Sequence, residues 1–211
     1  MSVIAVVNPK GGAGKSTLAT NLAGHFAANG EWTALGDIDP QLSSHGWLGI
    51  RPPVLAKIEA WLPERHALTK PPRGIEYAIL DTPAGVDAEG LKQIAALADK
   101  LIVPLQPSIF DIYATQTFLE VLAKEKSIKR RHIEVAIVGM RVDARTKSAE
   151  QLHLFVEGLG FPVLTYLRDT QNYVQLAAHG LSLWDVAPSR VERDLEQWAA
   201  LTDWARAKAK S

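Results

Sequence analysis

A glycine-rich segment near the N-terminus holds two lysines and two hydroxyl side chains in an order that suits phosphate binding. Residues 8–17 read Asn-Pro-Lys-Gly-Gly-Ala-Gly-Lys-Ser-Thr and lie between an apolar run, residues 3–7, and a helix-like run that begins near Gly14. Glycines let the backbone turn tightly and aim N–H groups at an anion, which the positive end of the following helix also attracts. In such a loop, Lys15 reaches the β- and γ-phosphates and the Ser16 hydroxyl ligates Mg²⁺.

The segment departs from the common pattern G-x-x-x-x-G-K-S/T at one position, because Pro9 stands where that pattern has its first glycine. A second lysine, Lys10, follows it. The resulting order K-G-G-x-G-K-S/T resembles the deviant Walker A motif of the ParA/MinD family of ATPases. The resemblance implies that Lys10 reaches across an ATP-sandwiched dimer to the partner's nucleotide. The residues expected to hold ATP are Lys10, Gly11, Gly12, Ala13, Gly14, Lys15, Ser16 and Thr17.

Carboxylates follow two other strand-like runs. The sequence DIDPQ, residues 37–41, ends one run, and Asp81 ends another. Ligands collect at the carboxyl ends of strands in open α/β sheets. The family resemblance implies that Asp39 orients the attacking water, that Asp37 supports it, and that Asp81 is the Walker B acid, which holds Mg²⁺ directly or through a water. Plain turns after strands are the alternative reading of both segments.

Strands and helices alternate along the chain, so the elements that position these side chains form βαβ units. Strand-like runs are 3–7, 32–38, 77–81, 101–105, 133–139 and 162–167, and helix-like runs are 14–30, 91–97, 111–124, 148–159 and 191–208. This alternation predicts an α/β fold with a mostly parallel sheet covered by helices on both faces. A chain of 211 residues is expected to form one domain, residues 1–211, with the last helix docked on it.

Two regions fit this scheme less well. Residues 43–74 contain five prolines around one short helix-like piece, residues 55–62, and are expected to decorate the surface. Pro104 cannot donate a backbone hydrogen bond, which predicts an end or edge position for its strand. Residues 103–108 resemble the family's third segment. Arg168 falls where relatives contact the nucleotide base, but base contacts stay unassigned.

Composition excludes several kinds of site. The chain has no cysteine, which removes disulfides, thiolate metal sites and the clusters of the iron–sulfur relatives of this family. Its six histidines show no ligand-like spacing. No apolar run approaches the roughly 18 residues that span a bilayer, so stable membrane insertion is not expected. Basic and acidic residues number 23 each, so any binding to nucleic acid must be local.

One local charge excess is present. Residues 124–147 contain eight basic residues and three acidic ones, which predicts either a solvated helix end or a DNA-contacting surface. The residues expected to contact DNA are Lys129, Arg130 and Arg131, with Arg190 and Arg193 extending the surface by resemblance to the family.

The resemblance implies a short ParA-like partitioning ATPase without an N-terminal DNA-recognition domain. Such a protein dimerises with ATP and Mg²⁺, binds DNA nonspecifically, and hydrolyses ATP when a cargo-adaptor protein stimulates it. The cargo is a plasmid, a chromosome region or a protein assembly. The protein is expected in the cytoplasm, on the nucleoid when ATP-bound. Slow turnover without a partner is expected, because no obvious arginine finger sits beside the loop.

Two alternatives stay open. A MinD-like membrane cycler would need a helix with a basic polar face, whereas residues 191–208 place acidic and basic residues around an apolar stripe. An ATP-dependent metabolic ligase of the same superfamily would usually lack a lysine at the position of Lys10. ATP is favoured over GTP because residues 146–149 lack the aspartate of the N/T-K-x-D element.

Overall fold

A seven-stranded β-sheet forms the centre of the computed structural model, which describes residues 1–63, 68–143, 145–158 and 160–207. The strand order is β3-β2-β4-β1-β5-β6-β7, and all neighbouring strands are parallel. The strands are β1 (Ser2–Val6), β2 (Thr33–Asp37), β3 (Ile58–Trp61), β4 (Tyr77–Asp81), β5 (Lys100–Leu105), β6 (Glu134–Gly139) and β7 (Val163–Tyr166). The six predicted strands and the predicted fold class are confirmed.

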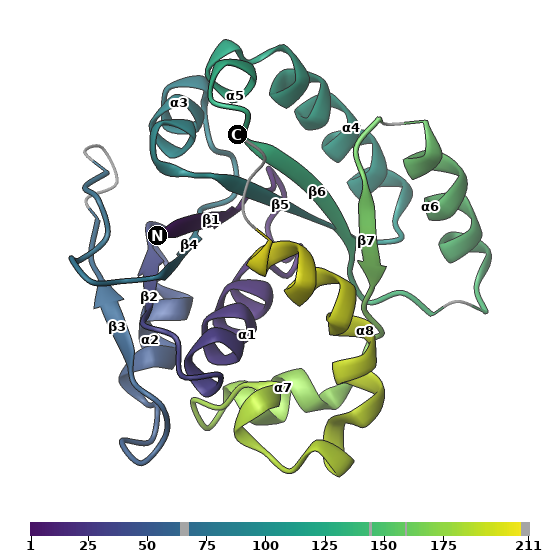
Figure 1. Ribbon diagram of the computed structural model, residues 1–211. Helices are drawn as coiled ribbons and strands as arrows, with labels where there is room; N and C mark the ends of the chain where they lie inside the picture. Colours follow the sequence, from purple (N-terminus) through teal and green to yellow (C-terminus); the bar gives the residue numbers. More distant parts are fainter. Residues whose placement is uncertain (64–67, 144, 159, 208–211) are drawn as a thin grey trace.

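Helices cover both faces of the sheet (Figure 1). They are α1 (Lys15–Ala28), α2 (Ser43–Gly49), α3 (Ala88–Leu97), α4 (Ile109–Lys124), α5 (Lys126–Arg130), α6 (Lys147–Glu157), α7 (Gln171–Ala177) and α8 (Pro188–Arg206), with a 3-10 turn at Leu183–Asp185. The ends predicted at positions 159 and 208 lie outside the described residues. Helices α2, α5 and α7 are short and were not predicted.

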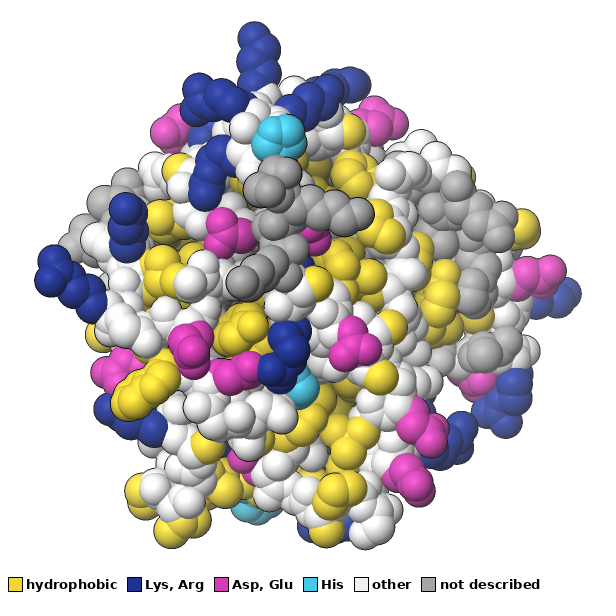
Figure 2. Space-filling view, in the orientation of Figure 1, with side chains coloured by type: hydrophobic (Ala, Val, Ile, Leu, Met, Phe, Trp, Pro, Cys, Tyr) yellow, Lys and Arg dark blue, Asp and Glu magenta, His cyan; other side chains and the backbone are white. Residues whose placement is uncertain are grey.

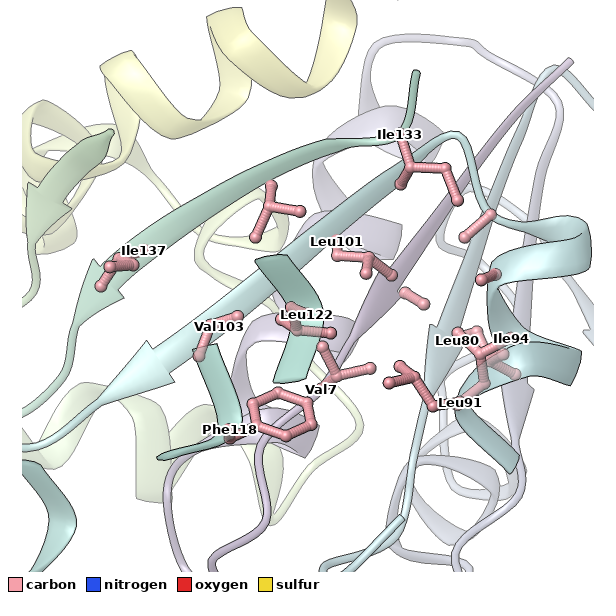
Figure 3. Packing of buried hydrophobic residues seen from close by; sticks show 14 of the residues in the cluster. Val7, Leu80, Leu91, Ile94, Leu101, Val103, Phe118, Leu122, Ile133 and Ile137 are labelled. Carbon is pink, nitrogen blue, oxygen red and sulfur yellow. The ribbon is translucent and has the colours of Figure 1, made fainter. Parts of the chain in front are cut away.

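Alternation along each strand divides the apolar residues between two cores. In β1, Ile4 and Val6 face the core under α1, α2, α7 and α8, whereas Val3 and Ala5 face the core under α3 to α6. Figure 3 shows this second core, in which strand residues pack against α3 and α4. Such two-sided burial explains why the strands read as nearly continuous apolar runs.

The helix-like piece predicted at residues 55–62 is wrong, because residues 58–61 form strand β3 at the edge of the sheet, paired with β2. Ile58 and Trp61 are three residues apart, which suits one face of a helix. In the strand they point to opposite faces, and each is buried in a different core. Trp61 covers Gly36, where an added Cβ would lie 2.7 Å from the indole.

Of the two positions predicted from Pro104, the edge is wrong, because β5 lies between β1 and β6, whereas the end is confirmed, because Pro104 is the last residue but one of β5. The carbonyl of Ile102 faces β1 and accepts from Val7, so alternation also points the nitrogen of Pro104 toward β1. Pairing with β1 has ended at Ile102, and the missing N–H therefore breaks no ladder bond. Instead, the Asn8 side-chain amide donates to the carbonyl of Pro104 over 2.6 Å, which fixes the start of the glycine-rich loop.

Helix α8 packs its apolar stripe on the face of the sheet that α1 also covers. Val191, Trp198, Leu201 and Ala205 are buried there. The fully buried Lys100 donates from its Nζ to the carbonyl of Trp204, which ties the end of α8 to the start of β5. The apolar stripe therefore serves the core.

Candidate nucleotide-binding site

The glycine-rich loop joins the carboxyl end of β1 to the N-terminus of α1. Gly12 and Gly14 have φ angles of +75° and +97°, which other residues rarely adopt. Gly14 is the N-cap of α1, and the first turn of that helix has neither a side-chain cap nor an acidic residue. The free N–H groups of this turn are therefore available to an anion.

The loop borders a cavity of about 320 Å³. Its lining consists of Gly11, Gly12, Ala13, Gly14, Lys15, Ser16, Thr17, Asp39, Gln41, Ser43, Ala84 and Arg141. All of the loop residues expected to hold ATP contribute to this lining except Lys10. The cavity thus combines a helix N-terminus, two basic side chains and one carboxylate.

Lys15 lies among the acids that the sequence singles out. Its side chain is buried and donates from Nζ to the carbonyl of Lys10 over 3.1 Å. Burial lowers the pKa of Lys15, while the charges of Asp81 and Asp39 oppose this shift. The fold therefore brings Lys15, Asp39 and Asp81 into one electrostatic group.

Asp37 shapes the loop that presents Asp39. One of its oxygens accepts from the backbone N–H of Asp39 at 2.9 Å, and the other accepts from the N–H groups of Ser44 and His45 at 2.9 and 3.1 Å. Both carboxylate oxygens of Asp37 thus accept hydrogen bonds from backbone N–H groups of the segment that contains Asp39. Asp39 is half-exposed and borders the cavity, so a carboxylate is available there to a water or a ligand.

Asp81 supplies a buried carboxylate beside the loop. It is 1% exposed, and its Oδ2 accepts from the Ser44 hydroxyl at 2.7 Å. Burial raises the pKa of Asp81 to about 6, against the hydrogen bonds from the hydroxyls of Ser16 and Ser44. Its Oδ1 has no partner among the described residues.

A hard cation suits this place. Mg²⁺ prefers oxygen ligands and usually binds one or two protein oxygens together with phosphates. The unpartnered Oδ1 of Asp81 and the neighbouring Ser16 hydroxyl provide such oxygens. No group of three or more His, Asp or Glu residues that could hold a metal alone occurs in the described part of the chain. The residues present therefore fit Mg²⁺ bound together with a phosphate ligand.

Arg141 was missed as a site residue because the sequence groups it with the basic run 124–147. It follows β6 at the edge that carries the glycine-rich loop, has a φ of +54°, and borders the cavity. Arg141 therefore lies at the cavity, although no arginine finger is obvious beside the loop in the sequence. A usable signal was its position two residues after the end of the predicted strand 133–139, since strand ends in this fold meet at the site.

Residues 103–108, which resemble the family's third segment, contact the glycine-rich loop, whereas Arg168 is bound to α8. Gln106 donates from its side chain to the carbonyl of Gly12 over 2.7 Å, which ties the residues before α4 to the loop. Arg168 instead donates to the fully buried Asp194 of α8 over 2.6 Å. Its guanidinium therefore tethers α8.

The predicted DNA-contacting residues lie in two separate places. Lys129, Arg130 and Arg131 are exposed around α5, which precedes β6 and so lies at the edge opposite the glycine-rich loop. Figure 2 shows Lys and Arg side chains gathered over α5 at the top of the view. Arg131 also donates to the carbonyl of Ala95.

The basic residues that follow β6 lie elsewhere. Arg145 follows β6 and is paired with Asp143 at 2.9 Å. The basic run is therefore divided by β6. Arg190 and Arg193 are exposed near the start of α8. In the described part of the chain, no helix is both long and apolar enough to cross a bilayer.

Known proteins resemble this chain in sequence and fold. Residues 4–183 match the CobQ/CobB/MinD/ParA nucleotide binding domain. The chain is 34% identical over 185 residues to the maintenance of carboxysome distribution protein A of Gloeobacter kilaueensis, covering 86% of this chain and 83% of the relative. It is 25% identical over 191 residues to the protein of the same name from Halothiobacillus neapolitanus, covering 87% of each.

A solved structure shares the fold. The complex of a Cyanothece McdA variant with ATP superimposes with a TM-score of 0.71 at 16% identity, covering 95% of this chain and 96% of that chain. The family match spans the glycine-rich loop, both acidic segments, β1 from Ile4 onward and the other six strands. The chain therefore belongs to the CobQ/CobB/MinD/ParA family of nucleotide-binding proteins, as its two-lysine loop predicts.

Proposed function

We propose that this chain is a ParA-type ATPase that binds ATP with Mg²⁺, dimerises on ATP, and uses hydrolysis to distribute a cargo. The observation that supports this proposal most strongly is the meeting of Lys15, Asp39 and Asp81 at one glycine-rich helix N-terminus. Phosphoryl transfer needs positioning and charge stabilisation more than covalent chemistry. A cationic loop beside a carboxylate that borders the cavity supplies both.

Each residue then has one task. The loop N–H groups and Lys15 hold the phosphates, and Ser16 and Asp81 hold Mg²⁺, which when bound neutralises phosphate charge. Asp39 orients a water, because its carboxylate borders the cavity while Asp37 fixes the backbone beneath it. Arg141 adds a positive charge on the opposite side of the loop from Asp39.

Dimerisation is supported by a lysine and three apolar side chains that are exposed to solvent near the glycine-rich loop. Lys10 is half-exposed, and its ammonium has no acceptor among the described residues. Ile109, Phe110 and Tyr113, at the start of α4, are 46%, 75% and 61% exposed. They follow Gln106, whose side chain contacts the carbonyl of Gly12, so α4 begins on the same side of the sheet as the loop. A second copy that faces this edge would cover the apolar side chains and bring its lysine to the nucleotide, since cations must offset two facing phosphate groups.

DNA binding is supported by the exposed basic residues around α5 and at the start of α8. In a dimer joined at the loop edge, the two α5 clusters lie at the far ends. Each copy contributes its own phosphate contacts, so an ATP dimer carries two separate DNA-contacting clusters, each of which releases counterions where it binds. Binding is expected to be nonspecific and steeply salt-dependent.

The cargo is proposed from the relatives. Two of them are named for carboxysome distribution, and we take a large protein assembly as the cargo, reached through an adaptor protein that stimulates hydrolysis. The protein would act in the cytoplasm, on the nucleoid when ATP is bound.

Light scattering with and without ATP and Mg²⁺ tests the proposal. Wild type should dimerise with ATP, whereas Lys10→Ala and Phe110→Asp should stay monomeric while still binding ATP. Val54→Asp is the matched control. Val54 is 90% exposed but lies before the amino end of β3, away from the carboxyl strand ends that carry the loop. An ATP-bound wild type that stays monomeric would refute the proposal. A wild type that ignores duplex DNA at low salt and binds anionic liposomes would also refute it and would favour a membrane cycler.

A further inference from the structure

Two buried acids stand side by side at the site. Asp37 and Asp81 end neighbouring strands β2 and β4 and are register partners. They are 7% and 1% exposed. Like charges so placed repel each other, and each carboxylate can rotate unless hydrogen bonds hold it. The orientation of Asp81 decides which of its oxygens a metal ion can reach.

Ser44 contacts both acids. Its backbone N–H donates to Oδ2 of Asp37 at 2.9 Å, and its hydroxyl donates to Oδ2 of Asp81 at 2.7 Å. Ser44 is fully buried in the first turn of α2. Because Asp37 also accepts from the N–H of Asp39, one connected set of hydrogen bonds joins the water-orienting acid to the metal-binding acid.

We propose that Ser44 is a positioning residue for the magnesium site, where its hydroxyl holds Asp81 with Oδ1 free for the metal and its amide fixes the loop that carries Asp39. This inference rests on the proposed function, since it assigns Mg²⁺ to Asp81. Hydrogen-bond partners of metal-binding carboxylates commonly set metal affinity, and their loss costs about 10- to 100-fold.

The neighbouring residues separate the hydroxyl from the backbone. Alanine and cysteine at position 44 keep the backbone N–H that donates to Asp37, so Ser44→Ala removes only the side-chain contact to Asp81. His45 also donates its amide to Asp37 over 3.1 Å, but its side chain is exposed, so His45→Ala is the matched control. Ser44→Cys keeps the approximate shape of the side chain while its thiol is a weak donor.

The experiment titrates Mg²⁺ into protein saturated with ATP at constant pH 8 and follows the rise in melting temperature. Ser44→Ala and Ser44→Cys should need at least about tenfold more Mg²⁺ for half of the rise. His45→Ala should match wild type. Calorimetry with EDTA present should give all four proteins the same affinity for ATP, because the hydroxyl acts only on the metal.

Two results would overturn the inference. One is a Mg²⁺ requirement in Ser44→Ala and Ser44→Cys within twofold of wild type, even where both melt at a lower temperature, since Ser44 would then only support the fold. The other is a loss of ATP affinity in Ser44→Ala with EDTA present that is as large, in fold-change, as its increased Mg²⁺ requirement, since the hydroxyl would then act on more than the metal. A wild type whose stability with ATP does not respond to Mg²⁺ would instead refute the proposed magnesium site itself.

Discussion

Three neighbouring glycines of the loop differ in what an alanine would meet, and this gives a graded prediction. Gly11 has an ordinary φ, and an added Cβ would have no neighbour within 4 Å. Gly12 has a φ of +75° and equally open space. Gly14 has a φ of +97°, and its Cβ would lie 2.7 Å from Cε of Met140. The series separates backbone strain from overpacking.

The expected free energies follow from these geometries. Gly11→Ala should leave stability unchanged or raise it by about 0.4–1 kcal/mol, because it restricts the unfolded chain. Gly12→Ala should cost about 1–2 kcal/mol, the strain of a left-handed alanine. Gly14→Ala adds a shift of the flexible end of Met140, about 1 kcal/mol at the low end of overpacking costs, for a total of about 2–3 kcal/mol. For a chain of this size that lowers the melting temperature by about 4–12 °C.

Urea unfolding without nucleotide measures the series directly. The order should be Gly11→Ala, Gly12→Ala and then Gly14→Ala from most to least stable. Gly14→Ala should also bind ATP more weakly than Gly11→Ala, because its N–H groups no longer point together. Equal stability of Gly14→Ala and Gly11→Ala would show that the loop lacks this conformation and would refute the reasoning.

Three further outcomes are expected. Asp39→Ala should keep ATP affinity but lose turnover, and accumulate as the ATP dimer; wild-type phosphate release would show that another group orients the water. Burial lowers the pKa of His25 to about 4, so up to about 3 kcal/mol of the free energy of unfolding is present above pH 6.5 and is lost as the pH falls toward 4. The free energy of unfolding of His25→Gln, measured with urea, should fall less over this window. An equal fall would contradict the shift. Lys129→Glu combined with Arg130→Glu should weaken binding to duplex DNA at least about tenfold at low salt in an anisotropy titration while the ATP dimer forms normally, and unchanged DNA binding would move the contact to the start of α8.

The sequence was sufficient for the parts of the site that follow from strand ends. Asp39 and Asp81 come after apolar runs, and parallel strands bring their carboxyl ends to one edge. Lys15 is fixed by its spacing within the loop. These positions depend on local pattern and sheet topology alone, so they could be predicted from residue type and order.

Other features depend on which way a side chain turns, and no periodicity reports that. Ile58 and Trp61 have helical spacing but serve two cores on opposite faces of β3. Arg141 looks like one member of a basic run until β6 carries it to the opposite edge from α5. Ser44 is an ordinary serine in sequence, and its contact with Asp81 exists only because β2 and β4 are neighbours.

The central claim is that the glycine-rich loop binds ATP with Mg²⁺ through Lys15. The most direct measurement is a calorimetric titration of ATP in Mg²⁺ into wild type and Lys15→Ala, with Lys70→Ala as an exposed control. Wild type and Lys70→Ala should bind ATP with the same affinity, and Lys15→Ala should show no binding, because among the described residues that line the cavity only Arg141 carries another positive charge, and it lies outside the glycine-rich loop. Equal affinity in Lys15→Ala and wild type would contradict the claim.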